Sequence, residues 1–193
     1  AGWLALGSGI AGGADVILIP EIPYDTQNIA DAILDRSRSG KHFSIVAVSE
    51  GAMSKQDRKI EKELINQKAA AKEKKEKEKA KKALEIFYAS QSERTLKLSR
   101  ELEKLTGLES RVTILGYVQR GGTPSARDRL LGSMIGGAAA ALIAKGKGGV
   151  MVSIKGQTTK PVKLETVVNK QRKVPVDHLW IDTARRVGTC LGN

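Results

Sequence analysis

The sequence predicts an α/β domain of three layers, in which a mostly parallel sheet carries helices on both faces. Three observations lead to this prediction. Short apolar runs, typical of strands buried on both faces, alternate with helical segments along the chain. Polar residues directly follow several of these runs, as expected where parallel strands end at a ligand-binding edge. One long charged segment, residues 54–104, interrupts the alternation.

The first part of the chain predicts a helix, a strand, a second helix and a second strand. Residues 1–13 are rich in Gly and Ala and predict a helix packed closely on a neighbour. The apolar runs at 16–20 and 43–51 predict buried strands. Between them, Thr26 as N-cap and Gly40 after the last turn bound a helix of about 13 residues.

The charged segment 54–104 differs from the rest in composition. It holds 16 Lys and Arg against 10 Asp and Glu, and therefore +6 of the net charge of +12. From Asn66 to Lys82 it has no large apolar side chain, which predicts solvated helix. A single helix of this length would extend about 75 Å. We therefore expect a hairpin or a protruding helical insertion, with partial disorder as the alternative.

The last part of the chain predicts a strand, a long helix, a strand and two shorter helices. The run at 111–117 predicts the third strand. Thr123, followed by a proline, supplies the N-cap of a helix that ends near Gly146. Residues 149–156 predict the fourth strand, and Asp177 is expected to cap the last helix.

Composition limits the class of protein. No apolar run approaches the about 20 residues that span a bilayer, and no secretory signal is recognisable, so we expect no membrane association. The single cysteine, Cys190, is expected to be a buried free thiol in a reducing, cytoplasmic compartment. The net charge raises a nucleic-acid hypothesis, but the many glutamates of 54–104 and the lack of aromatic residues before Phe87 argue against it.

Polar residues at the expected carboxyl ends of the strands predict a binding crevice. Glu50 follows the second strand, and Arg120 follows the third, beside Gly121 and Gly122. A carboxylate accepts hydrogen bonds from sugar hydroxyls, and a guanidinium binds phosphate with two parallel hydrogen bonds. The glycines allow close backbone approach, and the next helix N-terminus favours an anion. The combination predicts a phosphorylated sugar as ligand, although each residue taken alone fits a surface group or an ordinary loop.

The stretch LGYVQRGGTPSARDR, residues 115–129, resembles the LGHxQRGGxPxxxDR signature of 6-phosphofructokinases. Residues 2–25, 43–51 and 105–117 resemble further segments of that family in the same order. The resemblance implies a phosphofructokinase-like fold and, with Mg²⁺, transfer of a phosphoryl group to the 1-hydroxyl of fructose 6-phosphate in glycolysis. It leaves open whether ATP or pyrophosphate is the donor.

The resemblance also implies roles for individual residues. Glu50 would hydrogen-bond sugar hydroxyls, and Arg120 would bind the 6-phosphate. Arg111 would reach the 6-phosphate in a neighbouring subunit's site, which implies a homodimer or homotetramer with shared active sites. Tyr117 stands where the family usually has histidine, and its phenol is expected to preserve binding with altered affinity.

The family's donor-phosphate loop, catalytic aspartate and MGR motif would lie upstream of Ala1. We therefore expect residues 1–193 to be part of a substrate-binding domain that has no catalytic residue and is inactive alone, with ATP or pyrophosphate bound mainly by the other part.

A second site is implied by bacterial members of the family. A glutamate matching Glu21 helps to hold the Mg²⁺ of a nucleotide effector, and a lysine matching Lys41 contacts effector phosphate. Ser39 stands where some members have another basic residue, and Glu21 could instead be a structural carboxylate near a turn.

The alternative hypothesis is a non-catalytic regulatory or binding module. Its basic segment 54–104 would then contact polyanions or a partner protein.

Overall fold

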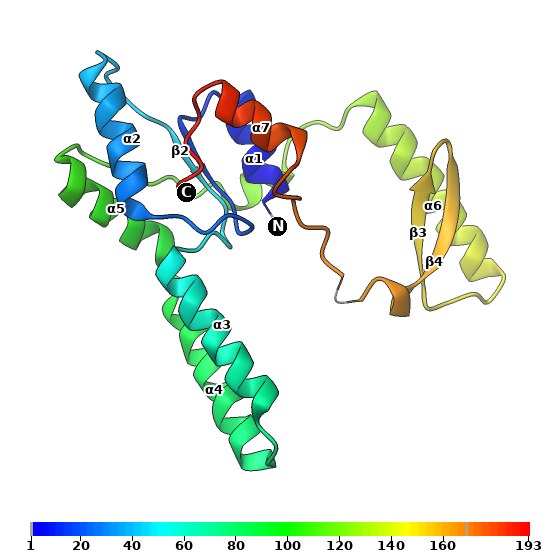
Figure 1. The fold of residues 1–193 in the computed structure, drawn as a ribbon. Helices are drawn as coiled ribbons and strands as arrows, with labels where there is room; N and C mark the ends of the chain where they lie inside the picture. Colours follow the sequence, from blue (N-terminus) through cyan, green and yellow to red (C-terminus); the bar gives the residue numbers. More distant parts are fainter. Residues whose placement is uncertain (1, 169) are drawn as a thin grey trace. The chain divides into compact units, whose positions relative to one another are not determined.

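The computed structural model describes residues 2–168 and 170–193, which divide into two compact units (Figure 1). The first unit extends to Val112 and also includes Arg172–Asn193, and the second is Thr113–Gln171. Within the described residues, no helix is both long and apolar enough to cross a membrane.

The first unit is built on two parallel strands, β1 (Val16–Leu18) and β2 (Val46–Val48), connected through α2 (Thr26–Arg38). Val16 pairs with Val46, and Leu18 pairs with Val48. On the other side of β1, Cys190 forms a parallel bridge with Val16. Both predicted strands are confirmed, over the first three residues of 16–20 and the middle three of 43–51, but only β1 is fully buried, and the residues of β2 are partly exposed.

Helices cover both faces of β1. Successive strand side chains point in opposite directions, so β1 contributes to two separate hydrophobic clusters. One cluster joins β1 to α1 (Trp3–Ala11) and α7 (Leu179–Arg186), and the other joins it to α2 and α5 (Arg94–Thr106). The principal members are Leu6, Ile17, Ile19, Ile181 and Ala184 in the first cluster, and Val16, Leu18, Ile29, Ile33, Leu98 and Leu102 in the second. The predicted α/β architecture is confirmed in this arrangement.

The charged segment is helical. Helices α3 (Lys55–Ala70) and α4 (Lys74–Ser90) pack side by side as a hairpin, and α5 returns to the core (Figure 1). Leu98 and Leu102 of α5 are buried against α2, so the end of the segment docks while the hairpin extends into solvent.

The second unit contains α6 (Ala126–Ala144) and an antiparallel pair, β3 (Val150–Lys155) and β4 (Thr158–Lys163). It also contains the 3₁₀ helices η1 (Gly116–Arg120) and η2 (Leu164–Thr166). The long helix and the fourth strand agree with prediction, whereas β4 was not anticipated.

The predicted strand at 111–117 is wrong. Residues 107–115 have no regular structure, and the chain turns into η1 at Gly116. A strand requires a neighbour to accept and donate its backbone hydrogen bonds, and within the described residues 111–115 pair with no strand. The apolar side chains of Ile114 and Leu115 are instead exposed.

The predicted helix caps are displaced by one or two residues. In each case a neighbouring side chain is placed to accept a backbone N–H of the first turn. The N-caps are Asp25 in place of Thr26, Ser125 in place of Thr123, and His178 in place of Asp177.

Cys190 is a free thiol, as expected, but it is only partly buried. Its Sγ accepts a hydrogen bond from the backbone N–H of Gly192 at 3.3 Å. The bridge to Val16 places Cys190 at the sheet edge rather than in the centre of the core.

Candidate sugar-phosphate site

The two parallel strands end beside one another, and this brings two predicted site residues into neighbouring loops. Beyond the last pair, Leu18 with Val48, the N–H of Ser49 donates to the carbonyl of Leu18 at 2.9 Å. The loop after β1 contains Pro20 and Glu21, and the loop after β2 contains Glu50. The polar edge predicted after these two strands is therefore present, whereas Arg120 follows no strand and belongs to the second unit.

Glu50 lies at the tip of a tight turn. The N–H of Ala52 donates to the carbonyl of Ser49 at 2.9 Å, which closes the turn around Glu50 and Gly51. The Glu50 side chain is exposed, and no hydrogen bond or ion pair involves it within the described residues. Its carboxylate oxygens are thus available to accept hydrogen bonds from a ligand.

Tyr117 and Arg120 lie together on η1. The Arg120 guanidinium carbon is 5.7 Å from the centre of the Tyr117 ring, a cation–π contact. Both side chains are exposed, and the described residues provide no carboxylate partner for Arg120. The phenol and the guanidinium therefore form one exposed polar pair in the second unit.

The glycines after Arg120 shape the approach to α6. Gly122 has φ +99°, a conformation that strongly favours glycine. The first turn of α6 is closed by a reciprocal capping box: Ser125 Oγ accepts the N–H of Asp128, and the Asp128 carboxylate accepts the N–H of Ser125 at 2.9 Å. These bonds from Ser125 lower the pKa of Asp128. The Asp128 N–H already donates to Ser125. Fewer backbone N–H groups at this end of α6 are therefore free to bind an anion.

Arg111 belongs to the first unit and is exposed. Its Nε donates to the Glu109 carboxylate at 2.9 Å, and both side chains are mostly solvated. Such a pair contributes little to stability, so Arg111 can exchange Glu109 for another anion at low cost.

Glu21 has a structural role in the first unit. Its carboxylate accepts the backbone N–H of Gly2 at 3.1 Å and that of Val174 at 3.0 Å. Partial burial would raise the pKa of Glu21, but these two N–H groups favour the ionised form and lower it. Glu21 thereby fastens the start of α1 and the segment before α7 to the end of β1.

The described side chains do not by themselves form a magnesium site. Across 2–168 and 170–193, no group of three or more His, Cys, Asp or Glu side chains is arranged to hold a metal ion. Glu21, the predicted ligand, already accepts backbone N–H groups. Lys41 is exposed, and no described hydrogen bond or ion pair joins it to Glu21.

Two further residues hold the loops at the strand ends and were not predicted. Arg94 donates to the carbonyl of Ala52, and Arg58 donates to the carbonyl of Pro20. Both belong to the charged segment, where they are two of 16 cations, and no sequence signal distinguishes them from solvated side chains.

A comparison with known protein families shows to which family this chain belongs. The family model described as Phosphofructokinase matches residues 1–143. The chain belongs to the phosphofructokinase family.

Relatives extend this result to the whole chain. An ATP-dependent 6-phosphofructokinase of Propionibacterium freudenreichii subsp. shermanii is 54% identical over 196 residues, covering 100% of this chain and 52% of the relative. A protein of the same description from Spirochaeta thermophila is 45% identical over 193 residues, covering 100% of this chain and 48% of the relative. The chain thus spans about half the length of the curated relatives it matches.

A solved phosphofructokinase structure has a similar fold. A pyrophosphate-dependent phosphofructokinase from Marinobacter aquaeolei superimposes with a TM-score of 0.57 at 19% identity, covering 100% of this chain and 46% of that one. At this identity the likeness concerns the fold alone.

Proposed function

We propose that this chain supplies the fructose 6-phosphate site of a 6-phosphofructokinase. Glu50 accepts hydrogen bonds from the sugar hydroxyls, Arg120 binds the 6-phosphate, and Tyr117 contacts the sugar. The observation that carries the proposal is the Tyr117–Arg120 pair on η1, where an exposed guanidinium without a carboxylate partner precedes two glycines. The family match over residues 1–143 includes all of these residues.

The reaction proposed is transfer of a phosphoryl group to the 1-hydroxyl of the sugar. ATP is the favoured donor, because the relatives described above are named ATP-dependent. Mg²⁺ would neutralise charge on the transferred phosphoryl group. Neither Mg²⁺ nor the donor is assigned to side chains of this chain, since the described residues contain no cluster that fits a metal.

The assembly proposed is a cytoplasmic homodimer or homotetramer. Arg111 would reach a phosphate bound by a neighbouring subunit, which its solvated and weakly held position permits. An effector site at Glu21 and Lys41 has less support, because the Glu21 carboxylate already accepts two backbone N–H groups.

Steady-state kinetics of the complete protein that carries this chain tests the proposed site. Arg120→Gln and Glu50→Gln should each raise KM for fructose 6-phosphate at least about tenfold, as expected when a charged hydrogen-bonding partner of a ligand is lost. Arg185→Gln, an exposed arginine on α7, is the matched control and should behave as wild type. Unchanged kinetics in both site variants would remove the assignment.

A further inference from the structure

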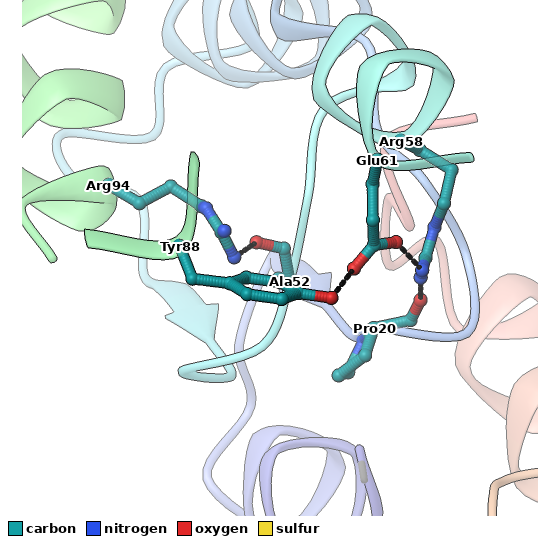
Figure 2. A network of polar contacts seen from close by, with 6 residues as sticks. All are labelled: Pro20, Ala52, Arg58, Glu61, Tyr88 and Arg94. Atoms are coloured by element: carbon teal, nitrogen blue, oxygen red, sulfur yellow. Dashed lines mark hydrogen bonds and ion pairs between the residues drawn. The ribbon is translucent and has the colours of Figure 1, made fainter. Parts of the chain in front are cut away.

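Two arginines of the charged segment donate to backbone carbonyls near the strand ends, Arg94 to Ala52 and Arg58 to Pro20 (Figure 2). Arg94 Nη1 donates to the carbonyl of Ala52 at 2.7 Å, and its Nε donates to Gln91 at 2.9 Å. Ala52 is fully buried, and its N–H closes the turn that carries Glu50. The Arg94 guanidinium therefore fastens the end of this turn to the start of α5.

Arg58 holds the neighbouring loop. Its Nη2 donates to the carbonyl of Pro20, and its Nη1 donates to the Glu61 carboxylate at 2.6 Å. Glu61 is buried and also accepts a hydrogen bond from the Tyr88 hydroxyl at 3.0 Å. Burial, followed by this bond to Glu61, raises the pKa of Tyr88, whose phenol is in any case protonated at neutral pH. The base of the α3–α4 hairpin thus orients Arg58.

The two loops are in direct contact. A Cβ on Gly51 would lie 3.0 Å from Pro20 Cγ, closer than ordinary packing allows. Pro20, whose carbonyl accepts a hydrogen bond from Arg58, therefore packs against Gly51 of the turn. The other end of this turn is held by Arg94. Glu50 precedes Gly51 and has no anchoring contact of its own in the described residues, so its position follows from the backbone that carries it.

We propose that Arg58 and Arg94 are positioning residues that hold the Glu50 turn in the conformation required for binding sugar. This inference rests on the proposed function of Glu50. Hydrogen bonds from a guanidinium to a carbonyl are stronger than neutral ones, and a buried carbonyl that loses its donor is costly. Binding groups lose effectiveness when their support allows displacements of more than about 0.5 Å. The charged segment would consequently influence substrate binding without touching the substrate.

Kinetics of the complete protein tests the proposal. Arg94→Met retains the apolar stem of the side chain but removes both hydrogen-bond donors. Arg58→Lys keeps a positive charge beside Glu61, but an amine lacks the planar guanidinium that donates to Glu61 and Pro20 at the same time. Each variant should raise KM for fructose 6-phosphate about five- to tenfold, with kcat and KM for the donor within about twofold of wild type. Arg94→Lys should be intermediate, because one amine can still reach the Ala52 carbonyl.

Arg100→Met on α5 and Lys59→Met on α3 are the controls. Both are exposed and lie on the same helices as the residues tested, so they should leave both constants unchanged. A KM for fructose 6-phosphate equal to that of the controls in both Arg94→Met and Arg58→Lys would overturn the proposal. Should Arg58→Lys fail to fold, Arg94→Met and Arg94→Lys decide the outcome.

Amide hydrogen exchange separates this proposal from the proposed function. Residues 49–53 should exchange at least about fivefold faster in Arg94→Met than in Arg100→Met, while exchange in β1 and α2 stays unchanged. If the wild-type protein does not use fructose 6-phosphate, the proposed function fails, and exchange alone still decides whether the arginines hold the turn. Equal exchange at 49–53 in both variants would contradict the positioning role.

Discussion

At the scale of the residue, two glutamates follow neighbouring parallel strands but have different partners. Glu21 accepts the N–H groups of Gly2 and Val174, which belong to distant parts of the first unit. Glu50 is exposed at the tip of its turn, with no described partner. The first carboxylate therefore stabilises the fold, and the second is the one available to a ligand.

This difference predicts how the stability of the Glu21→Gln variant depends on pH. Because the pKa of Glu21 is lowered from 4.5 in the folded protein, its ionised form adds stability above the unfolded pKa, and this contribution is lost as pH falls through the folded pKa. Denaturant unfolding should show Glu21→Gln less stable than wild type at pH 7, with a smaller difference at pH 3. An equal loss of stability for Glu21→Gln at both pH values would contradict the role of the charge.

At the scale of the element, α1 lies close to β1 because glycine replaces a side chain at the contact. A Cβ on Gly9 would lie 2.7 Å from both Ile17 Cδ1 and Ile17 Cγ1. Ile17 is fully buried in the cluster that joins α1, β1 and α7, so it has little room to move. The Gly-rich composition of residues 1–13 thus reflects close packing of helix on strand.

Gly9→Ala should destabilise the protein although alanine favours helix. Overpacking a core contact costs about 1–3 kcal/mol, which exceeds the gain of about 1 kcal/mol in helix propensity. Ser8→Ala, at an exposed position of the same helix, should be neutral or slightly stabilising. Thermal unfolding of the two variants measures the difference, and a stabilised Gly9→Ala would show that α1 and β1 are not in close contact.

The α3–α4 hairpin has a base that contacts the strand-end loops and a far end that is solvated. The contacts of Arg58, Glu61 and Tyr88 lie at its base, near the Glu50 turn, whereas the far end is almost entirely exposed. Replacing residues 67–79 with a short Gly-Ser loop should therefore leave KM for fructose 6-phosphate within about twofold of wild type. A tenfold rise in the same assay would mean that the exposed end takes part in binding.

At the scale of the whole molecule, the parts that could be predicted from sequence are those that depend on local pattern. Continuous apolar runs located β1 and β2, and alternation of these runs with helices led to the layered fold. The segment 111–117 has the same apolar character, but a strand also depends on a neighbour, which sequence does not reveal. In β4, the prolyl residue Pro161 and the lysines concealed the pairing with β3.

The candidate site likewise contains some residues that local sequence pattern predicts and others that depend on long-range contacts. Glu50 and Arg120 could be proposed from sequence because they follow apolar runs and stand beside glycines. Arg58 and Arg94 were missed because their partners are backbone carbonyls far away in the sequence, and a long-range contact of this kind leaves no periodic pattern. The same limit applies to Glu21, whose partners Gly2 and Val174 lie near opposite ends of the chain.

The most direct test of the central claim is turnover of fructose 6-phosphate by the complete protein that carries this chain. The purified, folded protein would be assayed with Mg²⁺ and fructose 6-phosphate, with ATP in one reaction and pyrophosphate in another. We predict formation of fructose 1,6-bisphosphate with ATP, and loss of saturation by fructose 6-phosphate in the Arg120→Gln variant. No turnover with either donor, from protein shown to be folded, would contradict the account and favour a regulatory or binding role.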